Sequence, residues 1–329
     1  MLNRRAWLRT AAGSGAALAL TPGLMRALES LGAGAGAQGA LLRKAIPATG
    51  ELLPVIGLGS SATFATVARS EEVSALKEVF QVMAERGATL FDTAPGYGVS
   101  EQVAGQIVNE LGIAGKMFWA TKLNAAGRGG GTTDPAAARA QVEQSFERLK
   151  RPKIDLIQVH NMSDVPTQLG VLKEYKKEGR VKYIGVTTTF EPQYPGLIEV
   201  MKSEPLDFIG IDYAADNRQV EEVILPLAQE RKMAVLAYAP FGRTSLFRRI
   251  GDRPLPDWAR DVDATTWAQL LLKWVVSHPA ITAVTPATSQ AKHMIDNIGG
   301  GIGRLPSPAQ RKALADFVDA LPPAPARTR

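Results

Sequence analysis

Four residues with side chains suited to proton transfer stand near the ends of consecutive β-rich runs. Asp92, Lys122 and His160 each close such a run, and Tyr97 lies in the loop after Asp92. A phenol with a pKa of about 10 is a poor acid or base at neutral pH unless a cation favours its ionised form. Lys122 can supply that cation, Asp92 can hold it, and His160 can hydrogen-bond the reacting oxygen. The set predicts a site that polarises a carbonyl group and delivers a proton to it.

Eight strand and helix pairs are needed to bring these side chains together. Strands that alternate with helices pair in parallel, and eight such units predict an α/β fold of the (β/α)8 TIM-barrel type. The active site of that fold lies at the C-terminal ends of the strands. Asp134-Pro135 predicts the start of one helix and Gly112 the end of another. The predicted strands are 54–58, 88–92, 117–121, 154–160, 181–187, 207–213, 233–238 and 281–285.

A doubly wound dinucleotide-binding fold is the alternative architecture. It is suggested by 57–62, which spells G-x-G-x-x-A after the first predicted strand. That fold needs a helix that begins directly at the glycines, whereas about ten residues precede the first helical period here. A second match, G-x-G-x-x-G at 34–39, follows no predicted strand. The barrel is therefore favoured.

Composition excludes several classes of protein. The 329 residues are 45% hydrophobic and 21% charged, which is typical of a folded protein, and the absence of Cys excludes disulfide frameworks and thiolate metal sites. Nor do the three histidines resemble a metal cluster. The net charge is +6, from 38 basic and 32 acidic residues, but four Arg and one Glu within 1–37 contribute +3 of it. The remainder is not strongly basic, so nucleic-acid binding is not expected.

The N-terminal segment resembles a twin-arginine (Tat) export signal. Arg4 and Arg5 lie in a basic stretch, a mildly apolar run follows at 11–20, and 35–37 offers small residues for cleavage. The apolar run is shorter than the roughly 20 residues that span a bilayer, so no stable membrane anchor is expected. We therefore expect the Tat machinery as a partner and a periplasmic or otherwise exported location. The predicted organisation is a signal peptide at 1–37, a barrel at 38–305, and a C-terminal helix with a disordered tail at 306–329.

Several motifs around the four polar residues resemble those of the aldo-keto reductases. Their order and spacing also match, and the similarity extends over roughly residues 45–299, through all eight predicted units. The matching segments are FDTAPGYG at 91–98, ATK at 120–122, IDLIQVH at 154–160, GRVKYIGVT at 179–187, VLAYAPFG at 235–242, TPATS at 285–289 and DN at 296–297.

This resemblance implies a catalytic tetrad of Asp92, Tyr97, Lys122 and His160, and a nicotinamide cofactor lying across the barrel rim. It also implies that hydride passes from the nicotinamide to the carbonyl carbon of a small-molecule substrate while Tyr97 protonates the oxygen. The cofactor carries the hydride chemistry and the protein positions it. The expected product is an alcohol, and the reverse reaction oxidises one.

The cofactor contacts that the resemblance implies depart from the family pattern in places. Thr187-Thr188 replaces the usual Ser-Asn pair, and Gly210 replaces a Gln. Tyr238 retains the aromatic on which the nicotinamide stacks. Lys292 and His293 leave positive charge for a 2′-phosphate, which favours NADPH, with NADH left open. The implied contacts are Thr187, Thr188, Tyr238, Thr288, Lys292, His293, Asp296 and Asn297.

Two other functions stay open at the level of sequence. Thr188 and Gly210 suggest a sensory protein that binds cofactor without turnover. A barrel isomerase or lyase would instead use Lys122 as a Schiff-base amine. Three aromatic residues are expected to line an apolar substrate pocket, and the glycine-rich loop at 127–131 is expected to form the edge of a lid. The aromatic residues are Phe64, Phe241 and Trp258. The natural substrate and the external redox partner are not encoded in any recognisable motif.

Overall fold

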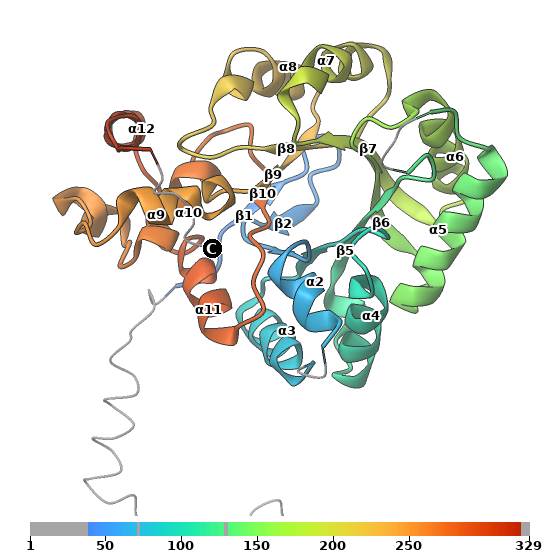
Figure 1. Cartoon of the computed structure of the whole chain (residues 1–329), viewed down its shortest axis with the longest axis horizontal. Helices are drawn as coiled ribbons and strands as arrows, with labels where there is room; N and C mark the ends of the chain where they lie inside the picture. Colours follow the sequence, from blue (N-terminus) through green and yellow to red (C-terminus); the bar gives the residue numbers. More distant parts are fainter. Residues whose placement is uncertain (1–38, 71–72, 128–130, 324–329) are drawn as a thin grey trace, which may run out of the picture. The chain divides into compact units, whose positions relative to one another are not determined.

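Eight parallel strands form the central sheet of the computed structural model, which describes residues 39–70, 73–127 and 131–323 (Figure 1). Each strand pairs with the next one along the chain, and parallel bridges from Ile56 to Val284 and from Gly59 to Ala287 join the first strand to the last. The predicted (β/α)8 TIM barrel is therefore confirmed. Its strands are β3 (Leu58–Gly59), β4 (Leu90–Asp92), β5 (Phe118–Leu123), β6 (Ile154–His160), β7 (Val181–Thr188), β8 (Phe208–Asp212), β9 (Ala234–Tyr238) and β10 (Ala283–Val284).

Helices alternate with these strands and surround them (Figure 1). They are α2 (Thr63–Ala68), α3 (Ser74–Arg86), α4 (Ser100–Glu110), α5 (Pro135–Leu149), α6 (Val165–Lys177), α7 (Tyr194–Ser203), α8 (Ile224–Glu230), α9 (Ser245–Ile250), α10 (Trp267–Val276), α11 (Ala291–Gly299) and α12 (Pro308–Asp319). Short 3₁₀ turns are η1 (Ala114–Lys116), η2 (Glu191–Gln193), η3 (Gln219–Glu221), η4 (Gly242–Thr244) and η5 (Asp257–Val262). Asp134 caps α5 by accepting a hydrogen bond from the Ala136 N–H at 2.9 Å, as predicted.

A hairpin that the sequence did not predict covers the N-terminal end of the barrel. Strands β1 (Arg43–Ala45) and β2 (Leu52–Pro54) pair antiparallel. Ile46 and Leu53 of this hairpin are buried in one cluster with Phe118 and Phe208, which lie at the starts of β5 and β8. The predicted strand 54–58 is therefore divided: the hairpin ends at Pro54 and regular pairing in the barrel begins at Leu58.

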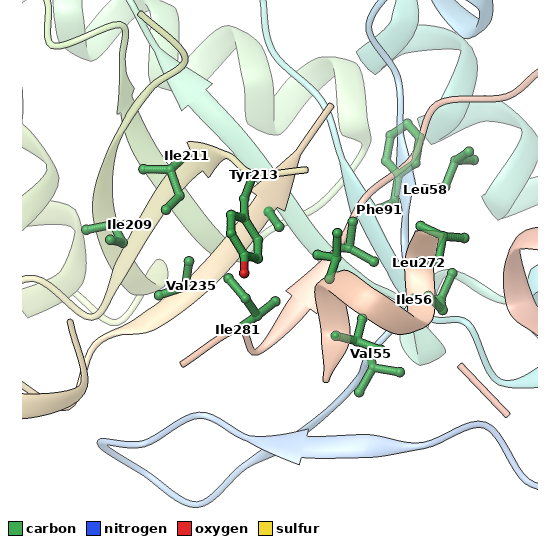
Figure 2. Close-up of a cluster of buried hydrophobic side chains, with 14 of the residues drawn as sticks. Val55, Ile56, Leu58, Phe91, Ile209, Ile211, Tyr213, Val235, Leu272 and Ile281 are labelled. Atoms are coloured by element: carbon green, nitrogen blue, oxygen red, sulfur yellow. The ribbon is translucent and has the colours of Figure 1, made fainter. Parts of the chain in front are cut away.

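The larger hydrophobic core lies between the strands and the helices (Figure 2). Alternate residues of a strand face opposite sides of the sheet. On β8, Ile209 and Ile211 belong to this outer core, whereas Phe208 belongs to the inner cluster. Phe64 is also part of the outer core, where it is 0% exposed and its ring centre lies 5.4 Å from that of Phe91. The expectation that Phe64 lines a substrate pocket was wrong, because packing against the barrel wall buries the side chain.

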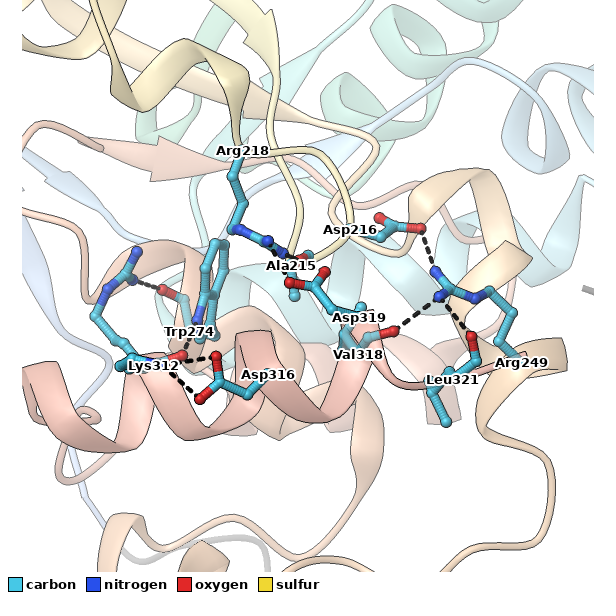
Figure 3. A network of polar contacts seen from close by, with 11 residues as sticks. Ala215, Asp216, Arg218, Arg249, Trp274, Lys312, Asp316, Val318, Asp319 and Leu321 are labelled. Atoms are coloured by element: carbon cyan, nitrogen blue, oxygen red, sulfur yellow. Dashed lines mark hydrogen bonds and ion pairs between the residues drawn. The ribbon is translucent and has the colours of Figure 1, made fainter. Parts of the chain in front are cut away.

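Helix α12 lies within the predicted C-terminal segment and is held by side chains of other elements (Figure 3). The Arg218 guanidinium pairs with the Asp319 carboxylate at 2.7 Å, and Arg249 donates to the Val318 carbonyl oxygen at 2.7 Å. These contacts fix the end of the helix beside α9.

Several predicted features fall outside the described residues. They are the export signal at 1–37, residues 128–130 of the loop expected at the lid edge, and residues 324–329 of the C-terminal tail. Within the described ranges, none of the helices is both long enough and apolar enough to cross a membrane.

Candidate active site

A cavity of about 580 Å³ lies at the C-terminal ends of the strands, where a barrel places its chemistry. Asp92, Tyr97, Lys122 and His160 all line it. Asp92 and His160 are the last residues of β4 and β6, and Lys122 is the next-to-last residue of β5 between them. Because these neighbouring strands run parallel, their ends meet at one rim. The structure therefore brings together the four side chains that the sequence singled out.

Lys122 and Asp92 form a buried ion pair in the floor of the cavity. The Lys122 Nζ donates to Asp92 Oδ2 at 2.7 Å and to the Thr93 carbonyl oxygen at 2.8 Å. Burial alone would lower the pKa of Lys122, but the negative charge of Asp92 opposes it and raises that pKa above its ordinary value. Lys122 is thus an ammonium cation at neutral pH, with two of its three protons engaged.

Tyr97 stands above this cation, in the loop between β4 and α4. A turn fixes the loop, because the Tyr97 N–H donates to the Ala94 carbonyl oxygen at 3.0 Å. The Lys122 Nζ lies 5.4 Å from the centre of the Tyr97 ring. Burial raises the pKa of Tyr97, and the opposing attraction of Lys122 does not overcome it. The sequence suggested that Lys122 lowers this pKa, but in the structure burial dominates and Tyr97 stays a protonated phenol.

His160 closes the cavity beside Tyr97. The two rings meet edge to face, with centres 5.8 Å apart. Burial, together with the positive charge of Lys122, lowers the pKa of His160 to about 3. The imidazole is therefore neutral at physiological pH and can donate or accept one hydrogen bond without adding charge.

Tyr238, at the end of β9, lines the cavity with its ring and turns its hydroxyl toward the tetrad. That hydroxyl lies 3.3 Å from Asp92 Oδ1 and accepts a hydrogen bond from Gln158 Nε2 at 2.9 Å. Gly210 on the neighbouring strand β8 makes room for the ring, since a Cβ there would lie 2.5 Å from Tyr238 Cε2. A Gln at position 210 would therefore collide with Tyr238 where it stands.

Comparison with known proteins places this site in a family. The family model described as "Aldo/keto reductase family" matches residues 55–307. The chain belongs to the aldo/keto reductase family. It is 28% identical over 287 residues to the probable aldo-keto reductase 1 of Glycine max, covering 76% of this chain and 79% of that protein. It is 26% identical over 252 residues to aldo-keto reductase str7 of Strobilurus tenacellus, covering 67% of this chain and 74% of that protein.

Solved structures show the same fold. An aldo-keto reductase of Klebsiella pneumoniae in complex with NADPH superposes with a TM-score of 0.69 at 22% identity, covering 88% of this chain and 98% of that one. The aldo-keto reductase AKR11C1 of Bacillus halodurans, in its holo form, gives a TM-score of 0.66 at 22% identity, covering 84% of this chain and 96% of that one.

The threonines expected to hold the cofactor differ in their surroundings. Thr187 lines the cavity and is 2% exposed. Thr188 instead accepts a hydrogen bond from the Phe190 N–H at 3.1 Å and lies 2.5 Å from Gln193 Oε1. Thr288 accepts one from the Gln290 N–H at 3.1 Å, just before α11. The hydroxyls of Thr188 and Thr288 therefore stabilise local turns, and neither residue lines the cavity.

The residues expected at the adenosine end of an aldo/keto reductase cofactor lie on α11, outside the cavity lining. Lys292 and His293 are exposed there. Asp296 already accepts hydrogen bonds from the Thr266 hydroxyl at 2.9 Å and from Gln269 Nε2 at 2.8 Å, and Asn297 is buried. Lys292 and His293 thus have exposed side chains, whereas Asp296 is engaged within the protein.

Two further cavity residues were missed by sequence reasoning. The Thr285 hydroxyl is buried against the cavity and has no hydrogen-bond partner among the described residues. Arg243 reaches the rim from the loop after β9, is 64% exposed at its side chain, and lies 3.7 Å from Asp212. Thr285 is the last residue of a predicted strand and Arg243 lies in the loop after another, which is the signal that a barrel topology offers. Phe241 lines the cavity as expected, while Trp258 packs against the outer core and is not part of the lining.

Proposed function

We propose that the chain is an NADPH-dependent carbonyl reductase, which converts a small aldehyde or ketone into an alcohol. The observation that carries this proposal is Tyr97. Its phenol is kept protonated by burial, it faces the cavity, and none of the hydrogen bonds found among the described residues occupies its hydroxyl. An unengaged acid above a buried cation is the arrangement that proton delivery to a carbonyl oxygen needs.

Each member of the tetrad has a role that its geometry supports. Tyr97 binds the carbonyl oxygen and gives it a proton. Lys122, whose third proton is not engaged by Asp92 or Thr93, stabilises the phenolate that Tyr97 leaves behind. His160, neutral at working pH, orients the carbonyl oxygen by a hydrogen bond. Asp92 holds Lys122 in place and keeps it charged.

The cavity fits the nicotinamide end of the cofactor. Thr187 and the unpartnered Thr285 hydroxyl would hold its amide, Tyr238 would stack on its ring, and Arg243 would meet its phosphates. When bound, NADPH supplies the hydride for the carbonyl carbon and leaves as NADP⁺. The Klebsiella pneumoniae aldo-keto reductase described above, solved in complex with NADPH, supports this cofactor over NADH. Exposed Lys292 and His293 on α11 suit the additional phosphate.

The proposal is tested by incubating the full chain with NADPH and a panel of aldehydes and ketones. We expect NADPH to be consumed only when a carbonyl compound is present, with one alcohol formed per NADPH, as measured by absorbance and by mass spectrometry of the product. Binding of NADPH without consumption on any carbonyl would instead favour the sensory alternative. Borohydride trapping of a substrate on Lys122 would favour the Schiff-base alternative.

We further propose that the protein is exported through the twin-arginine pathway. The support is the sequence of residues 1–37, with Arg4 and Arg5 before a short apolar run. Because that pathway carries folded proteins, the cofactor would be loaded before export. Replacing Arg4-Arg5 with Lys-Lys should keep the protein inside the cell, as shown by fractionation, and unchanged export of this variant would contradict the proposal.

A further inference from the structure

Two phenols, not one, face the ammonium group of Lys122. Its Nζ lies 5.4 Å from the ring centre of Tyr97 and 5.3 Å from that of Tyr238. The two hydroxyls differ in their partners. That of Tyr97 takes part in none of the hydrogen bonds found among the described residues, whereas that of Tyr238 is engaged on both sides. Tyr97 is thus available to a substrate, and Tyr238 belongs to the support beneath it.

The direction of the hydrogen bonds around Tyr238 follows from the partners. An ionised carboxylate only accepts, so the Tyr238 hydroxyl donates to Asp92 Oδ1, 3.3 Å away. The same oxygen accepts from Gln158 Nε2 at 2.9 Å. Tyr238 is the only donor found for Oδ1 among the described residues, while Oδ2 takes the proton of Lys122 at 2.7 Å. Each carboxylate oxygen of Asp92 therefore has its own donor.

The surroundings are built to keep this hydroxyl in place. Gln158 is 0% exposed, and its Oε1 has no partner among the described residues, so its amide serves Tyr238 alone. Gly210 leaves the space that the Tyr238 ring fills, since a Cβ would lie 2.7 Å from the Tyr238 hydroxyl oxygen. The site thus combines residues of β6, β8 and β9 around one hydroxyl, at the cost of an unpaired buried carbonyl group.

We propose that the Tyr238 hydroxyl is a positioning group for proton transfer: it fixes Asp92 by Oδ1, so that Oδ2 holds Lys122 beneath Tyr97. This inference rests on the proposed function for its kinetic consequence. It is distinct from stacking on a nicotinamide, which needs the ring of Tyr238 and not its hydroxyl. Without the hydroxyl, the buried carboxylate loses a donor and the ion pair is free to turn.

Tyr238→Phe separates the two roles because it removes the hydroxyl and keeps the ring. We expect kcat for carbonyl reduction to fall about tenfold, with the Kd for NADPH, measured by fluorescence titration, changed less than about twofold. Tyr183→Phe is the matched control. It removes a hydroxyl that bonds Glu51 and Thr49 of the β1–β2 hairpin, away from the cavity, and should leave both quantities unchanged. Unchanged kcat in Tyr238→Phe, or a loss explained wholly by weaker NADPH binding, would overturn the inference.

A double-variant cycle tests whether Gln158 acts through the same hydroxyl. Gln158→Leu removes the donor to Tyr238, and it should lower kcat in the wild-type background. In the Tyr238→Phe background the Gln158 amide has no Tyr238 hydroxyl to donate to, so Gln158→Leu should change kcat little further. Losses that multiply would show two independent contributions and would contradict the proposed chain from Gln158 to Asp92. If Tyr238→Phe folds poorly, the single variant Gln158→Leu, which keeps the Tyr238 ring, still tests the inference: unchanged kcat in it would contradict the proposed chain from Gln158 to Asp92.

A titration without cofactor or substrate distinguishes failure of this inference from failure of the proposed function. Phenolate absorbance, compared with and without Tyr97→Phe, reports the ionisation of Tyr97. We expect the pKa of Tyr97 to be higher in Tyr238→Phe than in the wild type. Asp92 has lost a hydrogen-bond donor in this variant, so its negative charge is less well neutralised and disfavours the phenolate. An unchanged or lower value would overturn the inference even if the wild type reduces carbonyls. The charged and titratable groups that face Tyr97 are Asp92, Lys122, His160, Tyr238 and Arg243.

Discussion

The proton-transfer site and the proposed cofactor site are built in different ways. At the proton-transfer site, Asp92, Lys122 and Tyr238 are held by hydrogen bonds that cross from strand to strand. At the proposed cofactor site, Arg243 lines the cavity from a loop and Lys292 lies outside the cavity lining on the exposed face of α11, and neither is fixed by a comparable network. Strand register thus places the proton-transfer residues in advance, whereas the residues proposed to hold the cofactor lie on a loop and on an exposed helix face.

Removing the cation should produce a large effect confined to the proton-transfer site. Lys122→Met should lower kcat for carbonyl reduction about a hundredfold, because the phenolate of Tyr97 loses its counter-charge. It also leaves the buried Asp92 carboxylate without its cationic partner, which should cost about 3 kcal/mol in the free energy of unfolding, measured with urea. The double variant Lys122→Met with Asp92→Asn should regain stability, because no buried charge is left unpaired, but its carbonyl reduction should remain slow. Recovery of turnover in that double variant would contradict the assigned role of Lys122.

The neutral His160 predicts a stability change with pH. Its folded pKa of about 3 lies below the ordinary value of about 6.5, so the unfolded state takes up the proton first as pH falls. Stability is therefore lost as pH falls below about 6.5 and continues to fall until about 3. Between about pH 7.5 and about pH 5, the protonation of His160 should account for a loss of about 2 kcal/mol in the free energy of unfolding.

Urea unfolding at both pH values measures this contribution. His160→Gln should reduce the pH-dependent loss by that amount, while His278, whose pKa is also lowered by burial, continues to contribute in both proteins. An equal loss in the variant would show that His160 titrates normally. The same neutrality predicts that the pH profile of kcat has no limb near pH 6.5 from His160.

Changes at the proposed cofactor site should be smaller and confined to binding. The double substitution Lys292→Ala with His293→Ala should weaken NADPH binding about tenfold and leave NADH binding unchanged, because these side chains are proposed to meet only the additional phosphate. Thr188→Val is the matched control, since the Thr188 hydroxyl bonds within its own turn. It should leave both affinities unchanged. Equal weakening of NADPH and NADH by the double substitution would remove these residues from the phosphate site.

The position of a site residue could be predicted from the sequence where it depends on a single strand. Asp92, Lys122 and His160 each follow from the end of a single run of residues, and parallel pairing then places them together. The inward hydroxyl of Tyr238 could not be predicted in this way. It depends on Gln158 of β6, Gly210 of β8 and Asp92 of β4 at once, and none of these marks Tyr238 in the linear sequence.

Competing physical effects limited the remaining predictions. The protonated state of Tyr97 results from burial outweighing the attraction of Lys122, and the sequence shows the cation but not the burial. Phe64 was assigned to a pocket because it was expected in a loop over the barrel rim, but it lies in α2 and its ring packs against Phe80 and Phe91. Thr188 was matched to a cofactor contact by position alone, and its side chain turns to the Phe190 N–H.

The role of Tyr97 as the proton donor is tested by the variant Tyr97→Phe. Wild type and variant should be compared for NADPH affinity and for steady-state carbonyl reduction in the same preparation. We expect an unchanged Kd for NADPH and a fall in kcat of about a thousandfold. Near-normal turnover in Tyr97→Phe would show that another group supplies the proton, and the tetrad as assigned here would be wrong.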